Sequence, residues 1–186
     1  MIIGLSGKAR SGKDTIGDYL SDNHKFFKLH FASALKNIVG EKLFNLSYEQ
    51  LYGDLKEVVD PRWGLSPRQI LQHSGTKLRE VYSDIWIKQV DKIIREEGPK
   101  GVNIVVCDIR FPNEMEMLRN LGDELNVPTY LVRLERLGFG IKDNKHASET
   151  ALDNLLLSTW DASISVPTGV LGLLDDFSCW FKEIIE

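Results

Sequence analysis

The sequence predicts an α/β fold, a three-layer sandwich in which helices cover both faces of a five-stranded, mostly parallel sheet. Five short apolar runs have the length and composition of strands that are buried on both faces. Segments with helical periodicity separate these runs, as expected for right-handed crossovers between parallel strands. With 186 residues, the chain is long enough for one such domain with a substantial core. We therefore expect residues 1–186 to form a single domain.

The predicted strands and helices alternate along the chain. The strands are Ile2–Ser6, Phe27–Phe31, Val102–Cys107, Thr129–Leu134 and Ala162–Val166. The first helix should run from about Lys13 to Ser21, and a second should begin near Ser33. Ser66 and Pro67 place a capping side chain before a proline at the first helical position, which is typical of a helix start. Residues from about 33 to 100 thus form a largely helical insertion between strands two and three.

Turn residues mark the later helices. One helix should start at Ser83 and stop at Gly98. Pro112 should begin a helix that Gly122 ends, and Thr168 can cap the last helix. Residues from about 135 to 148 contain glycines and charges without a clear period, which favours a mobile, lid-like loop; an ordinary surface connection has the same pattern.

A glycine loop with a lysine directly follows the first strand. The segment from Gly7 to Lys13 has the spacing G-x-x-x-x-G-K, in which backbone N–H groups and the lysine bind nucleotide phosphates. Glycines let the chain turn where a side chain would clash, and the following helix adds its positive N-terminal end. Asp14 stands where a Ser or Thr usually ligates Mg²⁺. The candidate ATP-binding residues of this segment are Gly7, Ala9, Arg10, Ser11, Gly12, Lys13, Asp14 and Thr15.

Charged side chains also lie at the ends of two other predicted strands, where α/β folds place ligands. Asp108 follows the third strand and could organise Mg²⁺ through water, hold a substrate group or simply form a turn. Arg110 suits bidentate phosphate binding, or an ion pair with Asp108 or Glu114. Arg133 and Arg136 bracket the end of strand four and could close over transferring phosphates, although one of them could be only a surface charge.

Two further segments contain candidate binding residues. Arg68, Gln72 and Arg79 lie in one helix-like stretch. If they point into a cleft, an arginine could hold a phosphate and the glutamine could read a base edge; if not, they form a solvated helix face. Pro167 follows the fifth strand and could border an adenine ring, or it makes only a strand-to-helix turn.

Composition restricts the class of partner. The formal net charge of −4 argues against a broad nucleic-acid-binding surface.

Cys107 and Cys179 lack metal-ligand spacing, and Cys107 ends an apolar run, as expected for a buried, reduced cysteine. His146 and Glu149 have no second histidine nearby, so we expect no metal site made of protein ligands. No apolar run is long enough to span a membrane, and the loop at residue 7 leaves no room for a signal peptide before it. We expect a cytoplasmic protein without nucleic-acid or membrane partners.

Taken together, several segments resemble the phage-type deoxynucleoside monophosphate kinases, a family within the P-loop kinases. The phosphate loop alone is common to many P-loop kinases, whereas the other segments are more specific. The stretch between Lys36 and Arg68 is compact, which leaves the preferred acceptor base and the dimer contacts open. The matching segments cover nearly the whole chain: Gly7–Thr15, Arg68–Thr76, Trp86–Lys88, Asp108–Arg110, Asn113–Met115 and His146–Glu149.

The resemblance implies a P-loop kinase fold and transfer of the γ-phosphate of ATP to a deoxynucleoside 5′-monophosphate. It also implies Mg²⁺ held mainly by phosphates and water, a homodimer as one option, and the host cytoplasm as location if a phage encodes the protein. Catalytic roles are expected for Lys13, Arg110, Asp108 and Arg136. ATP contacts are expected from the loop, Arg133 and Pro167, and acceptor contacts from Lys36, Arg68, Gln72, Thr76, Arg79 and Arg110.

Two other functions fit parts of the pattern. One is another small-molecule P-loop kinase, of the dephospho-coenzyme A or phosphomevalonate type. The other is an ATP-binding regulator without catalysis. Asp14 and the Arg68–Thr76 segment favour a nucleotide kinase over the coenzyme A type, and the several cleft-directed arginines favour catalysis over sensing.

Overall fold

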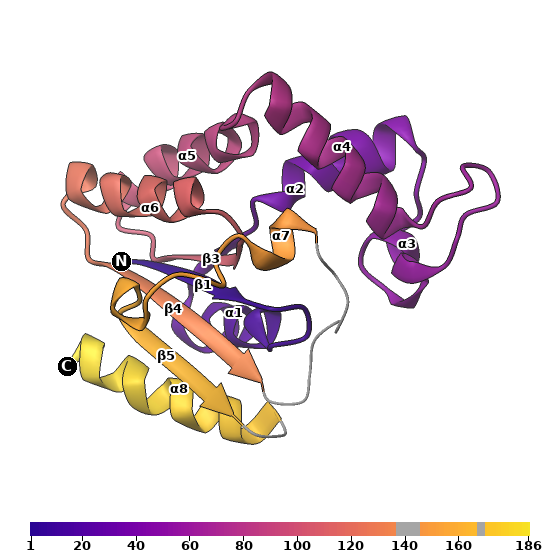
Figure 1. The fold of residues 1–186 in the computed structure, drawn as a ribbon. Coiled ribbons are helices and arrows are strands. Elements are labelled where there is room, and N and C mark those ends of the chain that lie inside the picture. The colour runs from indigo at the N-terminus through magenta and orange to yellow at the C-terminus, as the bar shows by residue number, and fades with distance from the viewer. Residues whose placement is uncertain (137–145, 167–169) are drawn as a thin grey trace. The chain divides into compact units, whose positions relative to one another are not determined.

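The computed structural model describes residues 1–136, 146–166 and 170–186, and the side chains of these residues except at positions 136, 166, 170 and 171. Figure 1 shows the fold. In chain order the elements are β1 (Ile2–Gly7), α1 (Lys13–His24), β2 (Phe27–Leu29), α2 (Ala32–Leu35), η1 (Lys36–Leu43), α3 (Tyr48–Leu51), η2 (Asp54–Glu57), α4 (Pro67–Val81), α5 (Ile85–Glu97), η3 (Gly98–Lys100), β3 (Ile104–Ile109), α6 (Pro112–Leu125), β4 (Thr129–Arg136), α7 (Ala147–Thr150), η4 (Leu157–Thr159), β5 (Ala162–Val166) and α8 (Val170–Ile185).

The five strands form one parallel sheet in the order β2-β3-β1-β4-β5, which confirms the predicted α/β fold. Strand β1 is central and buried along its whole length. Its neighbours β3 and β4 come much later in the chain, and all three strands end at the same edge of the sheet. The order therefore gathers the residues that follow β1, β3 and β4 at one edge, where open parallel sheets bind ligands.

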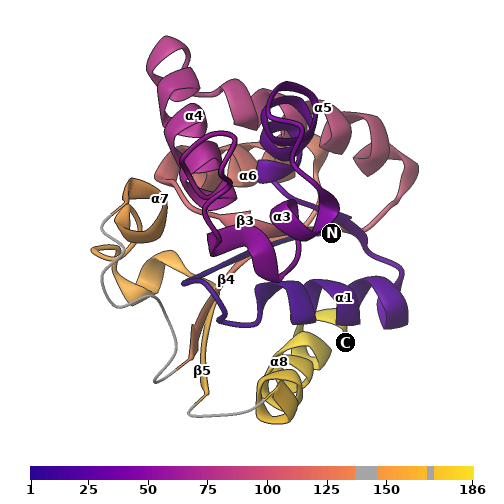
Figure 2. The same ribbon diagram turned by 90° about the vertical axis from the view of Figure 1, so that its right-hand side faces the viewer.

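Apolar side chains from both faces of the sheet hold the helices in place. On one face, Ile3 and Leu5 of β1 pack with Ile16 of α1 and Phe177 of α8. On the other face Gly4 lets α6 approach closely, because a Cβ at this position would lie 2.5–2.9 Å from three core side chains. Figures 1 and 2 show α1 and α8 on one side of the sheet and α6 on the other. The predicted three layers are thus present.

The chain divides into two compact units. Residues 1–30 and 91–186 form the unit that contains the sheet, and residues 31–90 form a second, largely helical unit. The second unit has its own small core, made by Leu46, Leu51, Ile70 and Leu71. Its longest helix, α4, begins as predicted: Ser66 accepts a hydrogen bond from the Gln69 backbone, and Gln69 reciprocates.

Several predicted boundaries were wrong. Helix α6 does not end at Gly122 but continues to Leu125, and Asn126 ends it in a left-handed conformation at φ 52°. Gly122 is needed for packing instead, since a Cβ there would lie 2.0 Å from Thr129 Oγ1. Strand β3 begins two residues later than predicted and includes Asp108, because the pairing with β1 extends to Ile109. Strand β2 stops at Leu29, and α1 extends to His24.

Three predictions lie wholly or largely outside the described residues: the lid-like loop over about residues 135–148, of which 137–145 are not described, the cap at Thr168 and the contact of Pro167. The described ends of that stretch belong to β4 and α7. None of the helices in the described ranges combines the length and apolarity that a membrane span requires.

Candidate active site

The loop between β1 and α1 has the shape that phosphate binding requires. Gly7 and Gly12 have positive φ values of 149° and 97°. A Cβ at Gly7 would lie 2.4 Å from the Leu134 carbonyl oxygen, and one at Gly12 would lie 2.1 Å from Leu173 Cδ2. Both positions therefore demand glycine for backbone and steric reasons. The first N–H groups of α1 have no acceptor within their own helix, which makes this end suitable for an anion.

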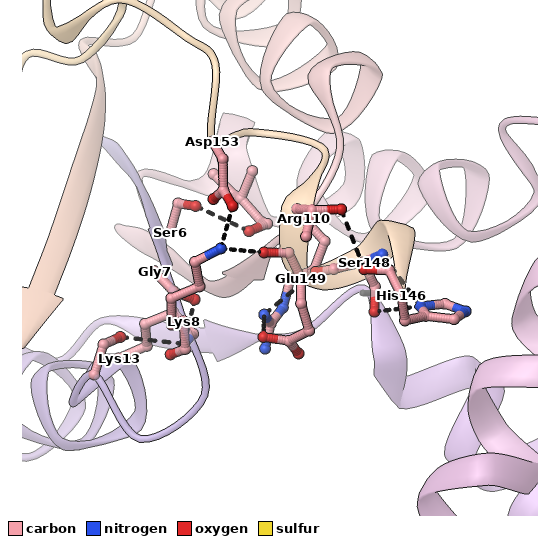
Figure 3. Close-up of polar contacts among 12 residues, drawn as sticks. Ser6, Gly7, Lys8, Lys13, Arg110, His146, Ser148, Glu149 and Asp153 are labelled. Carbon is pink, nitrogen blue, oxygen red and sulfur yellow. Dashed lines mark hydrogen bonds and ion pairs between the residues drawn. The ribbon is translucent and has the colours of Figure 1, made fainter. Parts of the chain in front are cut away.

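Lys13, the first residue of α1, lies against the loop that precedes it. Its Nζ atom donates to the carbonyl oxygens of Gly7 at 2.8 Å and Lys8 at 2.7 Å, and to Ser11 Oγ at 3.3 Å. Only 6% of Lys13 is exposed. The ammonium group thus lies directly beside the glycine loop (Figure 3). A ligand bound by the loop backbone would also lie within reach of this group.

The surroundings of Lys13 destabilise its charge. Burial lowers the pKa of Lys13 to about 7, and the guanidinium of Arg110 acts in the same direction. The carboxylates of Asp14, Glu149 and Asp108 oppose this shift. A lysine that is only half protonated near neutral pH gains its full charge when an anion binds beside it, so phosphate binding and protonation of Lys13 should be coupled.

Asp14, the residue after the lysine, lies among cations. Its Oδ1 atom is 3.4 Å from Lys28 Nζ and 3.6 Å from His30 Nε2. Burial would raise the pKa of Asp14, but the charges of His30 and Lys28 outweigh it and the pKa lies below its usual value. Asp14 therefore carries a full negative charge at neutral pH next to Lys13.

Arg110 follows β3 and is held at both ends. Its backbone N–H donates to Glu114 Oε2 at 2.7 Å, and its Nη1 atom forms an ion pair with Glu149 Oε2 at 3.0 Å. Glu149 comes from α7 and its side chain is only 8% exposed. The two pairings that the sequence suggested for Arg110 were Asp108 and Glu114. In the structure Glu114 accepts from the Arg110 backbone, and Glu149 pairs with the Arg110 side chain.

Arg133 of β4 and Lys8 of the phosphate loop share one carboxylate. Asp153 accepts from Lys8 Nζ through Oδ2 and lies 3.4 Å from Arg133 Nη2 through Oδ1. Arg133 also donates to Ser6 Oγ at 3.2 Å, and its guanidinium carbon lies 5.7 Å from the centre of the Trp160 ring. Arg133 is therefore a buried cation whose guanidinium group is held by the side chains around it.

These side chains surround one hollow beside the phosphate loop. It is bounded by the ends of β1, β3 and β4 and by the segment around α7, as Figure 3 shows. Among the described residues, no group of three or more His, Cys, Asp or Glu side chains could hold a metal ion. The residues that line the hollow are Ser6, Gly7, Lys8, Ile109, Arg110, Arg133, Ser148, Glu149 and Leu152.

Most of the other predicted ATP-site residues belong to the same unit. Ala9 and Arg10 form the turn of the loop, with Arg10 exposed and at φ 65°. Thr15 is half-buried in the first turn of α1. Asp108 is half-buried near the end of β3 and acts on Lys13 through its charge. Arg136 is the last residue of β4, and its side chain lies outside the described part of the chain.

Apart from Arg110, which belongs to the first unit, the predicted acceptor-site residues lie in the second unit. Arg68, Gln72, Thr76 and Arg79 all belong to α4, and their spacing of four, four and three residues puts them on one face of that helix. Arg68 Nε forms an ion pair with Glu57. Lys36 lies in η1 with its Nζ atom 4.1 Å from the centre of the Tyr52 ring, so it does not belong to the α4 set.

Sequence reasoning missed four residues that border or support the hollow: Ser6, Lys8, Asp153 and, as an ion-pair partner, Glu149. A second lysine inside the glycine loop and two carboxylates four residues apart, at positions 149 and 153, were the available signals. Spacing alone could not show that these groups, about 140 residues apart, meet at one sheet edge.

Comparison with curated proteins finds clear relatives. A protein of Acanthamoeba polyphaga mimivirus, described as a deoxynucleotide monophosphate kinase, is 36% identical over 169 residues, which cover 83% of this chain and 83% of that protein. The deoxynucleoside-5'-monophosphate kinase of Escherichia phage T5 is 33% identical over 111 residues, which cover 58% of this chain and 43% of that enzyme. No family model matches the chain.

Solved structures agree on the fold. A kinase from Chloroflexus aurantiacus superimposes with a TM-score of 0.54 at 12% identity, covering 98% of this chain and 96% of that one. Dephospho-CoA kinase from Campylobacter jejuni gives the same TM-score at 10% identity, with the same coverage. At such identities the likeness concerns the arrangement of strands and helices alone, which is that of the P-loop kinases.

Proposed function

This chain belongs to the deoxynucleotide monophosphate kinase family, and from that premise we propose that it transfers the γ-phosphate of ATP to a deoxynucleoside 5′-monophosphate. The products are the deoxynucleoside diphosphate and ADP. The observation that supports this most is the hollow beside the glycine loop, where Lys8, Arg110 and Arg133 converge near Lys13. Four cations from three strand ends suit a reaction in which negative charge must be bound and redistributed.

The reaction needs positioning and charge stabilisation rather than a base. An oxygen of the acceptor phosphate forms a bond to the γ-phosphorus, and the bond from this phosphorus to the bridging oxygen of ADP breaks. The acceptor oxygen is already anionic, so no proton has to be removed. We assign Lys13 and the loop backbone to the β- and γ-phosphates of ATP, and Arg110 to the acceptor phosphate or the transferring group.

The donor site fits a triphosphate chain. Gly7 and Gly12 keep the cradle free of side chains, and the N-terminal end of α1 faces it. The phosphates and water would supply most of the ligands of a Mg²⁺ ion here, whose charge would offset that of the phosphates. The carboxylates of Asp14 and Asp108 are close enough to Lys13 to affect its charge, and we assign them to water molecules of the Mg²⁺ shell rather than to direct ligation.

We assign the acceptor nucleotide to residues of the second unit. Arg68, Gln72, Thr76 and Arg79 share one face of α4, which gives two guanidinium groups for a phosphate and an amide for a base edge. Residues 31–90 are compact in themselves, which supports the expectation of an acceptor-binding insertion over about 33–100.

Trp160 is 8% exposed and therefore contributes little to any dimer surface, whereas Trp63 is 43% exposed and could belong to one.

The test is ADP formation from ATP and Mg²⁺ with each deoxynucleoside and ribonucleoside monophosphate supplied separately. Dephospho-coenzyme A and phosphomevalonate serve as acceptors of the alternative kinase types. We expect turnover with one or more deoxynucleotides and none above background with Lys13→Ala. Protein that binds ATP but phosphorylates none of the deoxynucleotides would overturn the proposal.

A further inference from the structure

The segment from His146 to Asp153 packs its polar groups onto the phosphate loop. Lys8 Nζ donates to the Glu149 carbonyl oxygen at 2.6 Å and pairs with the Asp153 carboxylate. Arg110 Nη1 donates to the Ser148 carbonyl oxygen at 3.4 Å in addition to its ion pair with Glu149. The segment thus contacts Lys8 after β1 and Arg110 after β3, although these residues precede their partners in it by 38 to 145 residues (Figure 3). Its Asp153 also lies 3.4 Å from Nη2 of a third cation, Arg133 of β4.

The start of this segment is fixed by its own side chains. His146 Nδ1 accepts from the Ser148 backbone N–H at 3.2 Å and lies 2.8 Å from Ser148 Oγ. These contacts cap the single turn of α7 and set the direction of Glu149 in that turn. The His-x-Ser-Glu pattern therefore has a structural consequence: it aims one carboxylate at Arg110.

Glu149 and Asp153 act on different cations. Glu149 lies with its nearly buried carboxylate on Arg110, whose backbone is fixed separately by Glu114. Asp153 joins Lys8 to Arg133 through its two oxygens. The carbonyl oxygen of Lys8 in turn accepts from Lys13 Nζ at 2.7 Å, so Asp153 is connected to Lys13 through Lys8.

We propose that Glu149 and Asp153 are positioning residues for phosphoryl transfer, which hold Arg110, Lys8 and Arg133 in place around the hollow. The inference rests on the proposed function. Lysine and arginine side chains have many rotamers, and the stabilisation of developing charge requires that they be oriented before reaction. A carboxylate paired with each cation supplies that orientation and leaves the remaining N–H groups for phosphate oxygens.

The variants Glu149→Gln and Asp153→Asn keep the shape of each side chain and remove its charge. We expect each to lower kcat/KM for the deoxynucleotide reaction by about 10- to 100-fold, the cost of a misplaced group in such sites. The matched controls are Glu124→Gln and Asp161→Asn, which remove equivalent partners of Arg95 and Arg119, at 2.7 Å in each case, away from the site. These controls should retain wild-type turnover.

A second readout separates positioning from a general loss of structure. Four charged groups act on Lys13, namely Arg110, Asp14, Glu149 and Asp108, and Glu149 favours its protonated form. Glu149→Gln should therefore move the pH midpoint of ATP binding to lower pH, an effect that lost packing would not produce. Asp153→Asn should leave that midpoint unchanged while weakening ATP binding, and Asp153→Glu should restore part of the affinity.

The outcomes are distinguishable. If the wild type phosphorylates deoxynucleotides and both variants stay within twofold of their controls, the inference fails and the proposed function stands. The inference also fails if activity falls in the variants and controls alike, in proportion to their melting temperatures. If the wild type transfers phosphate to no deoxynucleotide, the proposed function and the inference fall together.

Discussion

Lys13 should make ATP affinity depend on pH in a range where an ordinary lysine would not. Burial, with help from Arg110, lowers the pKa of Lys13 to about 7, whereas an exposed lysine titrates near 10.5. The nucleotide phosphates need the protonated form. Above pH 7, binding must therefore include the uptake of a proton by Lys13, and the affinity should fall as protons become scarce.

The size of this effect follows from the pKa. With a pKa of about 7, the protonated fraction of Lys13 in the free protein falls from about 24% at pH 7.5 to about 0.3% at pH 9.5. The dissociation constant for ATP should then rise about 75-fold, or close to tenfold for each pH unit. A lysine with the ordinary value of 10.5 would change the constant by only about 1.1-fold in that range.

Calorimetric titration with ATP, repeated from pH 7.5 to 9.5, measures both quantities. This range lies above the titration of the terminal phosphate, which has a pKa near 6. Two buffers with different ionisation enthalpies give the proton uptake directly, and about 0.9 proton per ATP is expected at pH 8. Lys13→Arg is the control, because arginine stays charged throughout and should give a flat profile. A flat profile in the wild type, with no proton uptake, would refute the reasoning.

Three other outcomes are expected. Lys13→Ala should lower turnover by at least about 100-fold with an unchanged circular dichroism spectrum, and wild-type turnover would contradict the assigned role. Gly12→Ala should lower the free energy of unfolding by about 1–3 kcal/mol in urea titration, because φ is 97° and the new Cβ would lie 2.1 Å from Leu173; equal stability would show that the loop relaxes without cost. Hydrogen bonds from Arg62 and, to a smaller extent, from Gln50 hold the pKa of Asp60 well below its usual range. The ionised carboxylate therefore stabilises the fold above about pH 4, and this stabilisation is lost as the pH falls. Asp60→Asn should therefore show a shallower loss of stability in acid than the wild type, and identical acid profiles would contradict the pairing.

The parts of the fold that depend on local pattern could be predicted from the sequence. The apolar runs gave all five strands, and the Ser66-Pro67 start of α4 was predicted with its cap. Boundaries failed where packing decides them. Gly122 is typical of a helix end, but the helix continues to Leu125, and the glycine is needed because Thr129 lies too close for a Cβ.

The residues of the candidate site also fall into two groups, those that a local pattern could predict and those that it could not. The glycine loop was predictable because its chemistry lies in one contiguous stretch around Gly7 and Lys13. Asp153 was not, because its contacts to Lys8 and Arg133 exist only after the sheet brings three distant segments together. The spacing of residues along the chain does not show which distant segments come into contact. The order of the strands in the sheet determines those contacts.

Both strands that pair with β1 come much later in the chain. Ile2 pairs with Ile104 on one side and with Thr129 on the other, and the groups that contact Lys8 follow later still, at Glu149 and Asp153. Strand pairings over such sequence separations form slowly, because the entropy of loop closure is lost before the stabilising contacts form. A nascent chain that exposes the glycine loop therefore cannot yet bind a nucleotide as the finished protein does. Nucleotide binding should thus report that these distant segments have come together.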